Sequence, residues 1–190
     1  MKIILASASP RRRELLEMLR VQSLEIVPAK GEEQPHPELG PEELVRELSR
    51  AKAAEIAVSA EPEDVVIGAD TVVALDGAVL GKPKDPADAK RMLTALSGRE
   101  HSVFTGVTVI RGGSCLQRAE HSRVRFRELE EDEIDRYIQS GEPLDKAGAY
   151  GAQGLASLFV ERIEGDFFNV MGLPLCLLGT MLKQFDIHLI

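Results

Sequence analysis

Short apolar runs alternate with amphipathic stretches along the chain, a pattern that predicts interleaved strands and helices. Strands are expected at residues 2–6, 24–28, 64–75, 78–80, 101–111, 115–127 and 157–163. Helices are expected at residues 10–20, 41–59, 86–97, 130–140 and 173–185, and loops at 29–40 and 145–157. Turn signals at Asp76-Gly77 and Gly112-Gly113 join neighbouring strands as hairpins. We therefore predict an α/β fold with a mixed central sheet flanked by helices.

The first predicted helix begins with an unusual distribution of charge. Ser9 and Pro10 are typical of an N-cap and a first helical residue, and three arginines follow, from Arg11 to Arg13. A helix N-terminus carries partial positive charge, so each exposed cation there costs about 0.3–1 kcal/mol. However, a helix N-terminus that follows a strand and a serine-bearing loop binds anions, and arginines contact phosphate well. Both a phosphate site and a solvated basic patch fit this stretch.

Three charged side chains elsewhere are further candidates. Asp70 lies in the apolar run GADTVV, where an unpaired carboxylate is expensive to bury. It could act as a general base or a metal ligand, or accept a hydrogen bond from a nearby backbone N–H. Lys82 in GKPKD and Lys52 on the second predicted helix are either phosphate ligands or exposed lysines. The segment GAVLGK is one residue too short for a Walker A phosphate loop, and Pro83 stands where that loop has Ser or Thr.

Composition limits the partners. The chain has 190 residues, a net charge of −8 and a pI near 5.1, which argues against binding of long DNA or RNA. No apolar run is long enough to span a membrane, and the apolar N-terminus is too short for a signal peptide. Cys115 and Cys176 lack a CxxC spacing, so we expect reduced thiols in a cytoplasmic protein. Scattered histidines and the absence of GxSxG give little support to a zinc or serine-hydrolase site.

Six motifs follow one another over nearly the whole chain: SASPRR, GADTVV, GKPKD, LSGREHSVFTGV, SGEPLDKAGAYGAQG and GDFFNVMGLP. Together they resemble the Maf family of nucleoside triphosphate pyrophosphatases. The resemblance implies one domain over residues 1–190, bilobed with a cleft and similar to the inosine triphosphatase architecture. Within the family, KAGAYGAQG is similar to the branch that acts on dTTP and UTP.

The resemblance also implies roles for individual residues. Asp70 would be the catalytic base, and Asp70 with Glu33 would hold a divalent metal cation, Mg²⁺ or Mn²⁺. The substrate and phosphate site would comprise Ser9, Arg11, Arg12, Glu33, Lys52 and Lys82. The positions associated with substrate choice are Arg11, Thr71 and Gln153. The Glu32-Glu33 pair departs from the Asp-Glu of many members. Arg13 falls outside the family pattern, so we expect it to be a solvated surface residue.

The expected reaction is hydrolysis of a nucleoside triphosphate to the monophosphate and pyrophosphate. Asp70 would activate the attacking water, and the Gln153 amide would match O4 and N3–H of uracil or thymine. Two alternatives stay open: a clean-up role on modified pyrimidine nucleotides, and a nucleotide-sensing regulator of septum formation in cell division without significant catalysis. The hairpin 101–127 offers a surface for a homodimer.

Overall fold

The computed structural model describes residues 1–31, 36 and 38–190, and within them one mixed sheet has the strand order β2-β1-β3-β5-β6-β7, with β4 paired to β3. The strands are β1 (Ile3–Leu5), β2 (Leu24–Ile26), β3 (Val65–Leu75), β4 (Ala78–Leu80), β5 (Glu100–Arg111), β6 (Ser114–Phe126) and β7 (Val160–Glu164). Strand β1 is parallel to β2 and β3, whereas β3, β5, β6 and β7 pair antiparallel. The predicted α/β class with a mixed sheet is confirmed.

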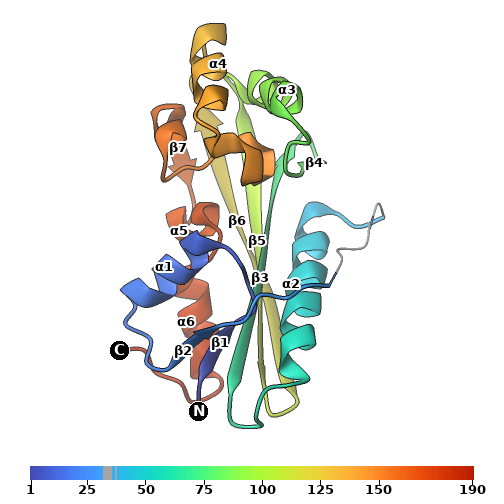
Figure 1. Cartoon of the computed structure of the whole chain (residues 1–190), viewed down its shortest axis with the longest axis vertical. Helices are drawn as coiled ribbons and strands as arrows, with labels where there is room; N and C mark the ends of the chain where they lie inside the picture. The colour runs from blue at the N-terminus through green and yellow to red at the C-terminus, as the bar shows by residue number, and fades with distance from the viewer. Residues whose placement is uncertain (32–35, 37) are drawn as a thin grey trace.

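Helices cover both faces of one half of this sheet (Figure 1). They are α1 (Pro10–Met18), α2 (Pro41–Ala57), α3 (Pro86–Leu96), α4 (Glu131–Gln139), α5 (Phe167–Met171) and α6 (Leu175–Lys183), with 3-10 turns η1 (Glu142–Asp145), η2 (Ala147–Ala149) and η3 (Leu155–Leu158). Helix α2 lies on one face, and α1, α5 and α6 lie on the other (Figure 1). Among the described residues, no helix has the length and apolar character that crossing a membrane requires.

Two lobes share the long strands β3, β5 and β6. The upper lobe contains β4, α3, α4, β7 and the 3-10 turns, and its core includes Leu93, Phe126 and Tyr150. The lower lobe contains β1, β2, α1, α2, α5 and α6, with Leu16 and Leu182 in its main core. The predicted bilobed shape is therefore confirmed (Figure 1).

One edge of β3 is only partly covered by neighbouring strands. Strand β1 pairs with residues 65–67, and β4 pairs with residues 73–75. On this edge, none of the described strands pairs with residues 68–72, although β5 continues along the opposite edge. The GADTV segment therefore lies at a gap in the sheet between the two lobes.

Two glycines allow α2 to approach the sheet closely. A Cβ atom added to Gly68 of β3 would lie 2.2 Å from the carbonyl oxygen of Ser49. A Cβ atom on Gly106 of β5 would lie 2.1 Å from the carbonyl oxygen of Val45. Because real Cβ atoms do not make contacts this short, any larger residue at either position would push the helix away.

The predicted elements differ most from the structure in the C-terminal part of the chain, after residue 154. The predicted strand 157–163 begins only at Val160, because residues 155–158 form η3 within the expected loop region. Helix α5 was not predicted, since five residues are too few to show a helical period. Gly172, with φ of 110°, ends α5, and α6 begins after Pro174 rather than at Leu173.

Candidate active site

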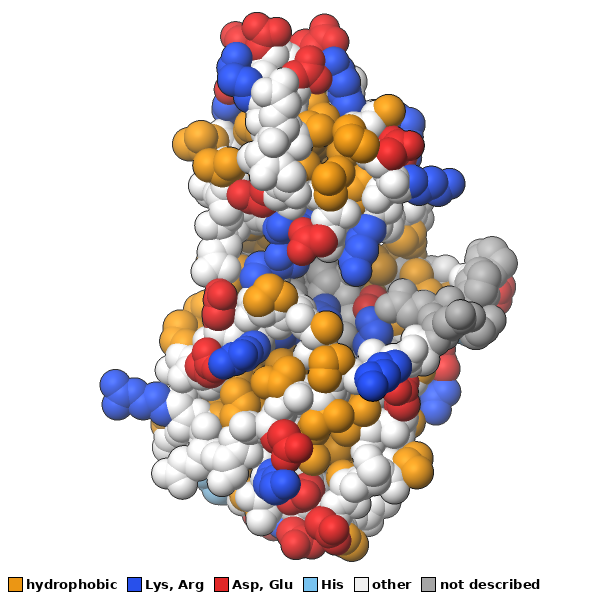
Figure 2. Space-filling view, in the orientation of Figure 1, with side chains coloured by type: hydrophobic (Ala, Val, Ile, Leu, Met, Phe, Trp, Pro, Cys, Tyr) orange, Lys and Arg blue, Asp and Glu red, His pale blue; other side chains and the backbone are white. Residues whose placement is uncertain are grey.

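A cleft of about 820 Å³ lies between the two lobes. Figure 2 shows the hollow across the middle of this face, with Lys and Arg side chains around it. Its lining includes seven residues that the sequence predicted for the site: Ser9, Arg11, Arg12, Lys52, Asp70, Thr71 and Lys82. Of the other two, Gln153 is exposed and does not appear in this lining, and Glu33 lies outside the described residues.

The N-terminus of α1 lines the cleft without a cap from a side chain. Ser9 occupies the N-cap position as predicted, but among the described residues its hydroxyl accepts no capping hydrogen bond. Its own backbone N–H donates to Ser7 Oγ at 3.2 Å. The first turn of α1 also contains no acidic residue. The partial positive charge of this helix end is therefore available to an anion in the cleft.

The three consecutive arginines have three different surroundings. Arg11 is half-buried and lines the cleft. Arg13 is exposed, and its Nε pairs with Glu17 Oε1 at 2.7 Å on the outer surface of α1. The expectation that Arg13 is a surface residue is confirmed.

Arg12 is buried, with 9% of its surface exposed. Among the described residues, its guanidinium donates hydrogen bonds to four oxygen atoms: Gly172 O at 2.7 Å, Ala69 O at 2.8 Å, Thr71 Oγ1 at 2.9 Å and Ser7 Oγ at 3.1 Å. Two of these partners, Ala69 and Thr71, flank Asp70 on β3. Arg12 therefore ties α1 and the end of α5 to the strand that carries the candidate base.

Asp70 and Lys52 form an ion pair at the cleft. Lys52 Nζ donates to Asp70 Oδ1 at 2.5 Å, and the Asp70 residue is 8% exposed. The pair depends on the close approach of α2, because Lys52 follows Ser49 by one helical turn and Asp70 follows Gly68 by two residues. The Lys52 ammonium thus orients a carboxylate that sequence analysis had placed in an unfavourable apolar strand.

A divalent cation fits this donor set if the substrate completes it. Among the described residues, no group of three or more His, Cys, Asp or Glu side chains could hold a metal ion. Magnesium, however, is commonly held by one or two carboxylates together with substrate phosphates. Asp70 supplies one such carboxylate at the cleft.

The upper lobe contributes a second charged pair that sequence analysis missed. Lys146 Nζ donates to Asp145 Oδ1 at 2.7 Å and to the Glu142 carbonyl oxygen at 2.6 Å, and both Asp145 and Lys146 line the cleft. Burial alone would raise the pKa of Asp145, but the hydrogen bond from Lys146 and the charges of Lys146 and Arg11 lower it overall. Asp145 and the N-terminus of α1 line the same cleft. The two residues stand in the DKAGAYGAQG motif, which was interpreted only through Gln153.

Comparisons with known proteins give a consistent result. A family model described as Maf-like protein matches residues 2–185. A dTTP/UTP pyrophosphatase from Bacillus cytotoxicus is 48% identical over 185 residues, which cover 97% of this chain and 96% of that protein. A protein of the same name from Bacillus cereus strain B4264 is 47% identical over 186 residues, which cover 98% and 96%.

Two solved structures share the fold at low sequence identity. The Coxiella burnetii HAM1 protein superposes with a TM-score of 0.53 and 17% identity, covering 97% of this chain and 99% of that one. The Staphylococcus aureus Ham1 protein gives a TM-score of 0.52 and 14% identity, with the same coverage. At these identities the likeness concerns the fold alone.

Proposed function

The chain belongs to the Maf family, and from this premise we propose that it hydrolyses dTTP and UTP to the monophosphate and pyrophosphate. The relatives named dTTP/UTP pyrophosphatase support this substrate choice, since they match nearly the whole chain. The observation that carries the proposal is the Lys52–Asp70 pair, which lies in the same cleft as the uncapped N-terminus of α1.

The phosphate chain is proposed to bind between the lobes. The N-terminus of α1 provides N–H groups and a fixed dipole, and Arg11, Lys52 and Lys82 add positive charge around the same space. These groups are held in place before the substrate arrives, so they would stabilise the charge that develops as the bond between the α- and β-phosphates breaks. Stabilisation of this developing charge is the main catalytic requirement of phosphoryl transfer.

Asp70 is proposed as the general base. A water molecule would attack the α-phosphorus in line with the departing pyrophosphate, and an Asp70 carboxylate oxygen would accept its proton. Lys52 holds Oδ1 of this carboxylate, which limits its rotation. Asp70 and Glu33 are the residues that would hold a divalent cation, whose charge would help to neutralise the phosphates.

The sequence-based expectations of a single domain over residues 1–190, a cytoplasmic location and a homodimer stay predictions.

A nucleotide panel tests the proposed activity. The purified protein is incubated with Mg²⁺ and each ribo- and deoxyribonucleoside triphosphate, and pyrophosphate and monophosphate are both measured. We expect the largest values of kcat/KM for dTTP and UTP, with equal amounts of the two products. Binding of dTTP or UTP without release of pyrophosphate from any nucleotide would instead favour the nucleotide-sensing regulator. Higher kcat/KM for modified pyrimidine nucleotides than for UTP would favour the clean-up role.

The Asp70→Asn variant tests the assignment of the base. Because general-base catalysis contributes about 10²- to 10⁴-fold, kcat should fall by about that factor while the far-UV circular dichroism is retained. Asp76→Asn is the matched control, since Asp76 is exposed in the turn that follows the same strand and lies outside the cleft lining. Near wild-type turnover by a folded Asp70→Asn protein would show that the base is another group.

A further inference from the structure

The wall of the cleft changes character from one lobe to the other. On the lower lobe, its lining includes the N-terminus of α1 together with Lys52 and Asp70. Toward the upper lobe, the apolar side chains of the lining are those of Val73, Val79, Val103, Ala147 and Tyr150, and Lys82, Asp145 and Lys146 stand beside them. Charged groups suit the phosphates, whereas an apolar wall suits the flat face of a nucleobase. The upper-lobe part of the cleft is therefore the better place for the base.

One charged pair stands at this apolar wall. Asp145 is the last residue of η1 and Lys146 follows it, and their side chains are joined by the 2.7 Å hydrogen bond between Lys146 Nζ and Asp145 Oδ1. The Asp145 side chain keeps 70% of its surface exposed, so its carboxylate can accept a further hydrogen bond. The pair presents an acceptor and a donor side by side.

Lys146 is held rigidly for a lysine. Its side chain is only 13% exposed, and Nζ also donates to the Glu142 carbonyl oxygen at 2.6 Å. Its aliphatic part packs against Gly151, where an added Cβ would lie 2.8 Å from Lys146 Cε. An ammonium has three hydrogens, and these two bonds to described residues leave one for a ligand. A donor fixed in this way loses little side-chain entropy when it binds.

We propose that Asp145 and Lys146 recognise the edge of a uracil or thymine base, with the Asp145 carboxylate accepting N3–H and the Lys146 ammonium donating to the adjacent carbonyl oxygen. This inference rests on the proposed function, and it places base recognition on the two residues beside the cleft rather than on Gln153, which is exposed outside the lining. A carboxylate at this position also disfavours the triphosphate there, because like charges repel. The nucleotide would therefore be oriented with its phosphates toward α1.

The same pair discriminates against cytosine in that orientation. Cytosine has a bare acceptor at N3 and an amino donor at position 4, so each group would face a partner of its own kind. Polar groups that a mismatched base covers lose their hydrogen bonds with water without gaining others. The pair therefore favours UTP and dTTP over CTP.

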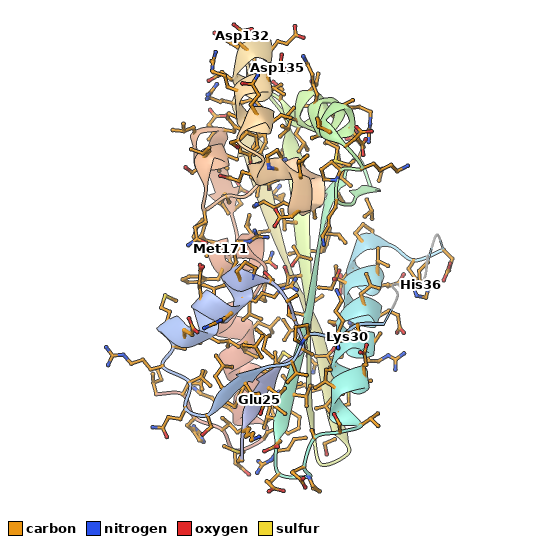
Figure 3. All side chains as sticks on the ribbon, viewed as in Figure 1. Glu25, Lys30, His36, Asp132, Asp135 and Met171 are labelled. Atoms are coloured by element: carbon orange, nitrogen blue, oxygen red, sulfur yellow. The ribbon has the colours of Figure 1, made fainter. Side chains whose placement is uncertain are left out.

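The test combines the Asp145→Ala variant with N3-methyl-UTP, in which a methyl group replaces the N3 hydrogen. For the wild type, we expect kcat/KM for UTP to exceed that for N3-methyl-UTP by about 10- to 100-fold, the range for one charge-assisted hydrogen bond. For Asp145→Ala, we expect this ratio to fall to within about threefold of one, and the UTP preference over CTP to decrease as well. Asp132→Ala is the matched control, since Asp132 lies at the far end of α4 (Figure 3) and should leave both ratios unchanged.

Three results would overturn the inference. A wild-type enzyme that uses N3-methyl-UTP as well as UTP needs no acceptor at N3. An equal loss for both nucleotides in Asp145→Ala would mean that the residue only shapes its loop. A rise in the Mg²⁺ concentration for half-maximal activity, with the UTP to N3-methyl-UTP ratio retained, would assign Asp145 to the metal. If the wild type releases no pyrophosphate from UTP, the proposed function fails by itself, and equilibrium binding of the same two nucleotides decides the inference separately.

Discussion

Replacement of Arg12 by methionine should destabilise the protein even when no nucleotide is present. The substitution keeps most of the apolar stem and removes the guanidinium, which donates to two backbone carbonyl oxygens and two hydroxyl groups. The hydroxyls can turn to other partners, and Thr71 Oγ1 already lies 2.9 Å from Thr105 Oγ1. The carbonyl oxygens of Ala69 and Gly172 have no such freedom. The cost of the substitution therefore depends mainly on these two groups.

The size of the effect follows from this count. A hydrogen bond with a charged partner contributes about 1.5–3 kcal/mol to stability. Loss of the bonds to the two carbonyl oxygens therefore costs about 3–6 kcal/mol. Removal of a buried cation returns part of this sum, because its desolvation cost disappears as well. We therefore expect a net loss of about 3 kcal/mol in the free energy of unfolding. For a chain of this length, such a loss lowers Tm by about 6–12 °C.

Calorimetry on the nucleotide-free protein measures this directly, with Arg13→Met as the matched control. Arg13 makes an exposed ion pair with Glu17, so its replacement should change stability by less than about 1 kcal/mol. If Arg12→Met melts at the wild-type temperature and only KM for dTTP rises, the residue is a phosphate ligand and the structural interpretation is refuted. A large fall in Tm for both variants would show that α1 is generally sensitive to charge removal.

Three further predictions test other parts of the fold and site. Gly68→Ala should lower the free energy of unfolding by about 1–3 kcal/mol and reduce turnover, because the added Cβ would push α2 away and displace Lys52 from Asp70. Gly179→Ala is the control: its added Cβ meets open space, so Tm should rise slightly in a thermal melt. Burial lowers the pKa of His101 from 6.5 to about 4, so the unfolded chain binds the proton first as pH falls. Urea titrations should therefore show a loss of about 3 kcal/mol in the free energy of unfolding between pH 6.5 and 4. The His101→Phe variant should lack this loss. Arg11→Glu should reduce kcat/KM for dTTP by at least about tenfold and Arg13→Glu should be mild, and equal effects would contradict the different surroundings of the two residues.

Sequence patterns predicted most of the fold because its main elements are long and strongly periodic. The run 64–75 and the pair 101–111 and 115–127 became β3, β5 and β6, with boundaries shifted by only one residue. The short elements were less predictable: α5 has one and a half turns, and η3 interrupts a segment whose β-branched and aromatic residues favour a strand. Packing determines such elements more than local propensity does.

The site was predictable in its residue types but not in its contacts. Asp70 was recognisable as a carboxylate in an apolar strand, yet its partner is on α2, 18 positions earlier, and spacing alone cannot show such a contact. Arg11 and Arg12 are adjacent in sequence and both line the cleft, but Arg11 is half-buried whereas Arg12 is buried and hydrogen-bonded to the backbone. Asp145 was hidden in a glycine-rich motif, where a charged residue is usually only solvated.

The gap in the edge of β3 gives a structural reason for the position of Arg11 and Arg12 at the start of α1. An uncovered strand edge leaves backbone N–H and C=O groups unpaired, and these groups can pair with a strand of another chain. Proteins therefore cover such edges or bind ligands at them. Here Arg12 donates to the edge carbonyl of Ala69, which has the effect of closing part of the gap from the side of α1. The remaining opening is the floor of the cleft, where Asp70 lies. Arg11, one residue earlier on the helix, lines the same opening. Its unfavourable interaction with the helix dipole is offset once an anion binds there. Two consecutive arginines therefore have different roles. Arg12 bonds to the exposed edge of β3, and Arg11 provides positive charge for an anion bound in the cleft.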